Sequence, residues 1–310
     1  MRRILLLALA TAVTAPALGY VVGPLAAQVL GGEVPEGAEA PSPDAQSAEG
    51  QTPDSSMDTL GPDSLNRIWL ALDLPGALDI MREEGEAMTD QIADDYLPNS
   101  SASSWVNAVA RIYDPQTMAR GMQGAFGEDL AGVDPQPVLA FFESDLGQRI
   151  IRLEMSARRA FLDEDTEEAA RERVRSDAVP SQRAELIEQF ITANDLVEYN
   201  TAGAMNTNLA FLTALSQAEI FEMSEQDILA QVYDGSEENR RDTEEWLRAY
   251  LTMAYQPLSD EELGVYIDFS RTEEGQRLNR ALFAGFGEMY TEQYRAIGLA
   301  VARQLTAQEL

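Results

Sequence analysis

Hydrophobic residues recur at helical spacing through most of the chain, from residue 65 onward. Two such runs are Trp105, Val109 and Ile112, and Leu278, Leu282, Phe286 and Met289. Intervals of three and four residues place these side chains on one face of an α-helix. Hairpin turn signals and extended alternation of apolar and polar residues, the patterns of β-strands, are absent from the sequence. The pattern therefore predicts an all-α fold.

One motif occurs twice. A Phe is followed three residues later by Ser or Thr, and then by Gly-Gln-Arg and a branched apolar residue. The motif residues are Phe141, Ser144, Gly147, Gln148 and Arg149 in the first copy and Phe269, Thr272, Gly275, Gln276 and Arg277 in the second. Two further matches lie upstream, Ala110–Asp114 with Ala230–Asp234 and Asp73-Leu74 with Asp195-Leu196. We predict two tandem, duplicated bundles of about five helices each, over residues 65–180 and 181–310, with Pro180 at the boundary.

The repeated motif has a structural interpretation. Ser144 and Thr272 are expected to cap the next helix, and Gly147 and Gly275 to let a neighbouring helix approach. The two arginines would lie outside or pair with acids. A ligand site built from Gln and Arg is the alternative interpretation.

The pairs Tyr113-Asp114 and Tyr233-Asp234 are typical of turns between helices. Each Asp can accept a backbone N–H of the next helix, and each Tyr can pack beneath the turn. Ser224 and Ser259 precede acidic residues and predict two further helix starts.

The N-terminus has the pattern of an export signal. Arg2-Arg3 precede an uncharged run from Ile4 to Gly32. We expect residues 1–27 to be a cleaved signal peptide or, alternatively, an uncleaved anchor; both place the rest of the chain in the periplasm or outside the cell. Residues 28–64, rich in Pro, Ser and acids and without a base after residue 32, are expected to form a disordered linker.

Composition excludes several kinds of chemistry. The chain has no Cys, His or Lys, so the usual zinc, haem and iron–sulfur sites, Ser-His-Asp triads and lysine Schiff bases cannot be built. A net charge of −31 argues against nucleic-acid binding. No cofactor or catalytic residue is predicted.

The charged runs are expected to lie in solvent. The acidic runs are Asp94-Asp95, Asp163–Asp165 with Glu167-Glu168, and Glu237-Glu238. None has the spacing of an EF-hand calcium loop, so no metal site is predicted. The densest basic run, Arg158-Arg159 with Arg171, Arg173 and Arg175, alternates with acids at helical spacing and predicts a salt-bridged helix surface.

The second copy resembles a known family. Pro257–Leu263, Phe269, Thr272 and Gly275-Gln276-Arg277 together resemble the DUF2059 family of small helical domains in exported bacterial proteins. The first copy matches only around Phe141–Ile150, because Val133–Gln136 replaces the Ser-Asp-Glu-Glu opening. The resemblance implies a helical fold and export, and it implies no active site because the family's function is unknown.

Three functions are compatible with these features. The first is a non-enzymatic interaction module that binds an unknown protein partner in the bacterial envelope. The second is a binding protein for an apolar small molecule or lipid, in a cavity between the copies near Met205, Phe211, Met253, Phe283 and Met289. The third is a glycan hydrolase, which needs two buried carboxyl groups with raised pKa values in one cleft.

Overall fold

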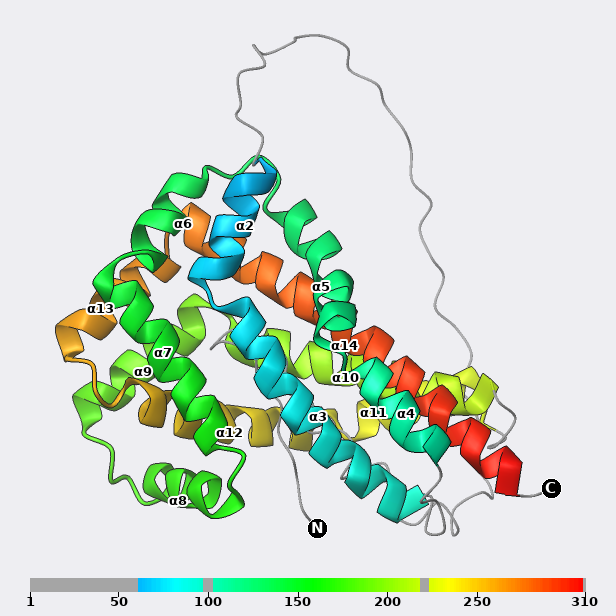
Figure 1. Cartoon of the computed structure of the whole chain (residues 1–310). Coiled ribbons are helices and arrows are strands. Elements are labelled where there is room, and N and C mark those ends of the chain that lie inside the picture. Colours follow the sequence, from blue (N-terminus) through cyan, green and yellow to red (C-terminus); the bar gives the residue numbers. More distant parts are fainter. Residues whose placement is uncertain (1–60, 97–102, 218–222, 309–310) are drawn as a thin grey trace, which may run out of the picture.

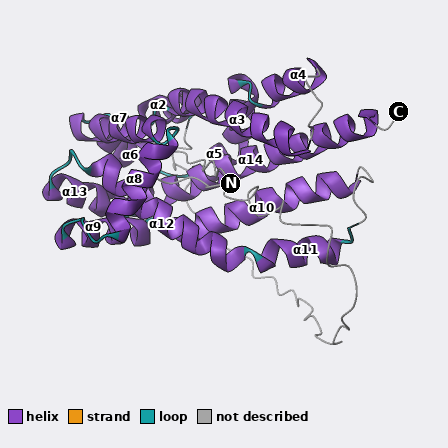
Figure 2. Cartoon of the chain, turned by 90° about the horizontal axis from the view of Figure 1, so that it is seen from below, coloured by secondary structure: helices purple, strands orange, loops and turns teal. Residues whose placement is uncertain are grey.

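The computed structural model describes residues 61–96, 103–217 and 223–308, and over these ranges the protein is built from helices and short turns (Figures 1 and 2). The helices are α2 (Pro62–Ala71), α3 (Leu74–Tyr96), α4 (Ser103–Ile112), α5 (Pro115–Asp129), α6 (Pro135–Phe142), α7 (Asp145–Ala160), α8 (Glu164–Arg175), α9 (Ser181–Ala193), α10 (Leu196–Gln217), α11 (Glu225–Asp234), α12 (Ser236–Tyr255), α13 (Asp260–Ser270) and α14 (Glu273–Gln308). The described residues contain no strand, which confirms the all-α prediction. The expected signal or anchor and residues 28–60 of the expected linker lie outside them.

Short-range hydrogen bonds explain where many helices begin. Side chains of Asp114, Asp134, Ser144 and Asp163 accept a backbone N–H from the first turn of α5, α6, α7 and α8. Ser224 and Ser259 form capping boxes with Asp227 and Glu262, as the sequence predicts. Helix α2 begins at Pro62, so residues 62–64, expected to belong to the linker, are helical.

The helices of the two halves interleave. Helix α14 crosses the length of the molecule, and α5 and α10 pack along it (Figure 1). Helix α12 packs against α7 and α8. Since α5, α7 and α8 come from the first half of the sequence and α12 and α14 from the second, one hydrophobic core extends through both halves. The boundary expected at residue 180 therefore does not separate two independent bundles in space.

The two motif copies touch each other through reciprocal contacts. The rings of Phe141 and Phe269 stack with their centroids 4.3 Å apart. Arg149 pairs with Glu262 at 2.7 Å and donates to the carbonyl of Pro257. Arg277 donates to the carbonyl of Ala131 at 3.3 Å. Arg149 thus reaches the start of α13, and Arg277 reaches the residues just before α6. Such reciprocal contacts are typical of a pair of units related by a two-fold axis.

Both copies of the motif form the same sharp corner between helices. Gly147 N–H donates to Ser144 Oγ, and Gly275 N–H donates to Thr272 Oγ1, each at 3.0 Å. A Cβ on either glycine would overlap the backbone carbonyl oxygen of the Phe six residues earlier. The absence of a side chain therefore lets α7 and α14 begin directly against the ends of α6 and α13.

The motif glutamines connect this corner to a second repeated element. Gln148 Nε2 donates to the carbonyls of Phe142 (2.8 Å) and Ala71 (2.9 Å). Gln276 Nε2 makes the equivalent bonds to Ser270 and Ala193. Ala71 and Ala193 end the helices that precede Asp73 and Asp195, two turn residues with positive φ (48° and 51°). The glutamines are therefore bonded to the protein's own helix ends in both copies.

Candidate functional site

A groove between α4, α5 and α14 has a size suited to a ligand. It encloses about 600 Å³, within the size range typical of small-molecule sites. Its lining consists of Ala108, Arg111 and Ile112 from α4, Thr117, Met118, Arg120 and Gly121 from α5, and Met289, Glu292, Gln293, Ala296, Leu299, Ala300 and Arg303 from α14. The groove has an apolar floor because Met118, Met289 and Ala300 are buried. Arg111, Arg120 and Arg303 are exposed at its rim.

The turn between α4 and α5 orients two walls of this groove. Asp114 accepts the N–H of Thr117 at 2.8 Å and so fixes the start of α5. The Tyr113 ring is buried and occupies the space where a side chain on Gly85 of α3 would lie. This turn has the structure that the sequence predicts. Tyr233 in the second half is 65% exposed, and the residue before α12 is Gly235, which provides no side-chain cap; the predicted packing of Tyr233 is wrong.

Glycines allow α5 to lie close to α14 beneath the groove. A Cβ on Gly285 would come within 2.8 Å of Met122 Cγ and 3.0 Å of the Met122 carbonyl oxygen. A Cβ on Gly121 would be 3.6 Å from the Met289 Cα. The absence of a side chain at Gly285 therefore lets the two helices approach closely, whereas at Gly121 a Cβ would make only an ordinary van der Waals contact.

Gln293 is a polar side chain on the apolar face of α14. It is 5% exposed, and neither its Oε1 nor its Nε2 has a hydrogen-bond partner in the described structure. A buried polar group without a partner costs about 1–3 kcal/mol. Gln293 also lines the groove, so an unpartnered polar side chain borders the space that a ligand would occupy.

The sequence identified little of this groove. Of the five residues proposed for a cavity between the copies, only Met289 lines it; Phe211 and Phe283 are buried in the core. The motif residues, Phe141 to Arg149 and Phe269 to Arg277, do not line it either. The signal in the sequence was a polar Gln293 on a face that otherwise carries Met289, Ala296 and Ala300.

A second cluster buries the carboxyl groups of two glutamates. Glu154 on α7 is 1% exposed, and its Oε1 accepts from the Tyr255 hydroxyl at 2.6 Å. Burial raises the pKa of Glu154 to about 7, and hydrogen bonds from Tyr255 and Tyr266 limit the rise. Glu84 on α3 is 2% exposed and forms a buried ion pair with Arg158. Burial raises the pKa of Glu84, although the Arg158 charge opposes the shift.

This cluster gives little room to a substrate. The space beside Glu154 is about 20 Å³ and is lined by Gly275, Phe269 and Tyr266, among others. That volume suits about one water molecule. A glycan therefore has no access to Glu154 here, and Glu84 is occupied by Arg158.

Replacement of Glu154 by Gln is expected to change how stability depends on pH. A folded-state pKa of about 7 against an ordinary value of 4.5 means that the folded protein binds the proton more tightly. The free energy of unfolding therefore falls as pH rises through this window, by roughly 2 to 3 kcal/mol between pH 5 and pH 8. The Glu154→Gln variant lacks this pH-dependent contribution. Urea unfolding at the two pH values should therefore show that the stability of the variant relative to the wild type increases by that amount from pH 5 to pH 8. A stability difference that does not change with pH would refute the assignment.

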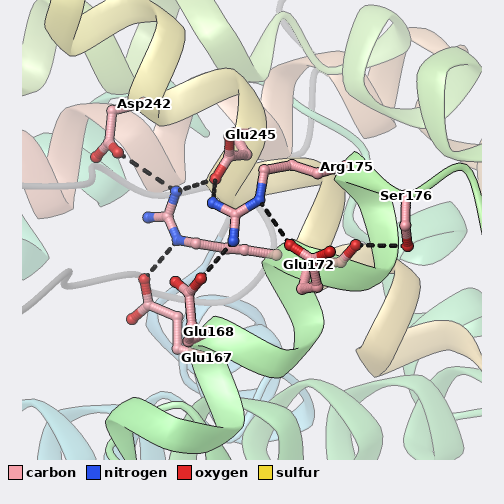
Figure 3. Close-up of polar contacts among 8 residues, drawn as sticks. Glu167, Glu168, Glu172, Arg175, Ser176, Asp242 and Glu245 are labelled. Carbon is pink, nitrogen blue, oxygen red and sulfur yellow. Dashed lines mark hydrogen bonds and ion pairs between the residues drawn. The ribbon is translucent and has the colours of Figure 1, made fainter.

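The basic run forms a polar cluster between α8 and α12 (Figure 3). Arg171, 6% exposed, contacts Glu167 at 2.8 Å, Asp242 at 3.3 Å and Glu245 at 3.1 Å. Arg175 contacts Glu168, Glu172 and Glu245. The predicted helix surface is correct for Arg175 but wrong for Arg158 and Arg171, which are buried. Arg158 pairs with Glu84 of α3, and Arg171 pairs with Asp242 and Glu245 of α12 as well as with Glu167 of its own helix. The cluster connects α8 to α12, and Arg171 contacts three carboxylates within it.

The described ranges contain neither a metal-binding group of acids nor a membrane-spanning helix. No group of three or more acidic side chains is placed to hold a metal ion. Asp163, from one acidic run, caps α8 instead, and Asp94-Asp95 have no described side chains. None of the described helices is long and apolar enough to cross a membrane.

Comparison with known proteins adds no relative: no family model, curated protein or solved structure matches the chain. The resemblance to the DUF2059 family stays a prediction.

Proposed function

We propose that the protein is a non-enzymatic binding protein that holds an apolar small molecule in the groove between α4, α5 and α14. The observation that carries the proposal is the groove itself, about 600 Å³ with a floor of Met, Ala, Ile and Leu side chains. Of the three functions compatible with the sequence, binding of an apolar molecule is the one with a site of suitable size. Export to the periplasm and interaction with a protein partner remain expectations.

Filling the groove with a bulky side chain tests this function. Ala296 is half-buried on the α14 wall, so Ala296→Trp is expected to occupy the groove. We expect dodecan-1-ol, measured by displacement of a neutral solvent-sensitive dye, to bind the wild type and to lose at least tenfold in affinity for the variant.

A matched control distinguishes occlusion from a general effect of tryptophan. Ala202 is exposed on α10 and does not line the groove, so Ala202→Trp should bind dodecan-1-ol as the wild type does. Circular dichroism of both variants checks that they are folded. Equal binding by the wild type and Ala296→Trp, or no binding by the wild type, would contradict the proposal.

A further inference from the structure

We infer that the ligand of the groove is a single-chain amphiphile with a carboxylate head group, of the fatty-acid type. This inference rests on the proposed function and names the class of ligand. It combines three features of the groove: an elongated apolar floor, a basic rim, and a buried polar side chain without a partner.

The rim of the groove is basic in a protein that is strongly acidic. The chain has 53 acids, 22 arginines and a net charge of −31. The groove nevertheless carries one arginine on each of its three walls, Arg111, Arg120 and Arg303. Within the described ranges, none of these three arginines forms an ion pair with a carboxylate. Arginine guanidinium groups bind carboxylates through paired hydrogen bonds. The rim therefore offers charge complementarity to an anionic group.

The polar neighbours of these arginines leave this capacity available. Arg120 Nη2 donates to Thr117 Oγ1 at 3.0 Å, which occupies one of its donors. The backbone N–H and the hydroxyl of Thr117 donate to Asp114 and lower the pKa of that carboxyl, to which the Arg120 charge also contributes, but Asp114 forms no ion pair with Arg120. Glu292, the one acid that lines the groove, pairs with Arg295 at 2.9 Å. The carboxylate of Glu292 is therefore paired with Arg295, which does not line the groove, and not with one of the three rim arginines.

The α14 wall of the groove suits a ligand with a long apolar tail and a polar end. From Met289 to Arg303 the α14 wall is about 21 Å long, at 1.5 Å per residue. Met289, Ala296 and Ala300 make it apolar along most of this length. Gln293 lies in the same wall, 5% exposed, with both polar side-chain atoms unpartnered. Its Nε2 is a donor for a ligand oxygen, and a carboxylate has two.

Three probes with the same tail test the inference on the full chain by titration calorimetry. They are dodecanoate, dodecan-1-ol and dodecyltrimethylammonium, each below its micelle concentration. We expect dodecanoate to bind at least tenfold more tightly than the alcohol, since charge-assisted hydrogen bonds are made only by the carboxylate. The cationic probe should bind more weakly than the alcohol.

Variants locate the origin of the preference. Replacement of Arg111, Arg120 and Arg303 together by Gln should abolish the advantage of dodecanoate over the alcohol, with both affinities measured on the same variant. Gln293→Leu should reduce dodecanoate binding more than alcohol binding. The matched control is Arg280→Gln, an exposed arginine of α14 outside the groove lining, which should keep the full preference.

The outcomes separate this inference from the proposed function. If the alcohol and dodecanoate bind the wild type equally, the inference fails and the binding function stands. If neither binds, both fail. Binding to vesicles of anionic phospholipid that persists in the triple arginine variant, with no preference for free dodecanoate, would also overturn the inference, because it would assign the affinity to a membrane surface.

Discussion

Replacement of Arg158 by Met is expected to destabilise the fold by about 4 kcal/mol, because it leaves the Glu84 carboxyl buried without its partner. Arg158 donates from Nε to Glu84 Oε1 at 2.8 Å and from Nη2 to Oε2 at 2.6 Å. Both side chains are no more than 3% exposed. Two charge-assisted hydrogen bonds and the desolvated charge of Glu84 therefore depend on one guanidinium.

The loss should depend on pH. Burial raises the pKa of Glu84 even beside Arg158, and without the guanidinium the folded state favours the protonated form more strongly. Stability is then present at low pH and is lost as pH rises above the ordinary range of a glutamate, so the deficit of Arg158→Met should be larger at pH 8 than at pH 5. Urea unfolding at both pH values measures it.

Two controls accompany this prediction. Arg159 is the next residue and is exposed, so Arg159→Met should change stability by less than about 0.5 kcal/mol. The double variant Glu84→Met with Arg158→Met should recover most of the loss, since two apolar side chains need no charge compensation. A double variant as unstable as the single one would show that the ion pair is not the cause.

Replacement of either motif glycine by Ala is expected to destabilise the fold by about 3 kcal/mol. A Cβ on Gly147 would overlap the carbonyl oxygen of Phe141, and a Cβ on Gly275 would overlap that of Phe269. Backbone atoms cannot turn aside as a flexible side chain can, so the corner between the helices would have to open. Opening it would also separate the glutamine Nε2 from its carbonyl partners.

A third glycine provides the matched control. Gly264 lies inside α13, and a Cβ placed on it would meet nothing within 4 Å. Gly264→Ala should stabilise the protein by about 1 kcal/mol, because Ala is a better helix former. The midpoint of urea unfolding measures all three variants. If Gly147→Ala and Gly275→Ala behave like Gly264→Ala, the close approach at the corner is not required.

Interactions between residues close in the sequence could be predicted. The caps at Ser144, Thr272, Ser224 and Ser259 involve residues only three positions apart. The interpretation of Gly147 and Gly275 also needed only the preceding helix. The all-α fold follows from periodicity, which is a local property of each helix.

Interactions between distant residues could not be predicted. Glu84 and Arg158 are 74 positions apart, and 53 acids offer too many possible partners. Arg158 and Arg159 are neighbours of the same type, yet only Arg158 is buried, because helix α7 turns them toward different surroundings. The groove depends on how α4 and α5 cross α14, which no local pattern specifies. The interleaving of the two halves escaped prediction for the same reason.

The groove between α4, α5 and α14 is the proposed place where a ligand binds. Methyl NMR of ¹³C-labelled methionines tests this directly, because Met118 and Met289 line the groove while Met81 and Met155 are buried elsewhere. Titration with dodecan-1-ol should shift the Met118 and Met289 signals saturably and leave those of Met81 and Met155 in place. Binding accompanied by no shift of the two groove methionines, or by equal shifts of all four, would contradict the account.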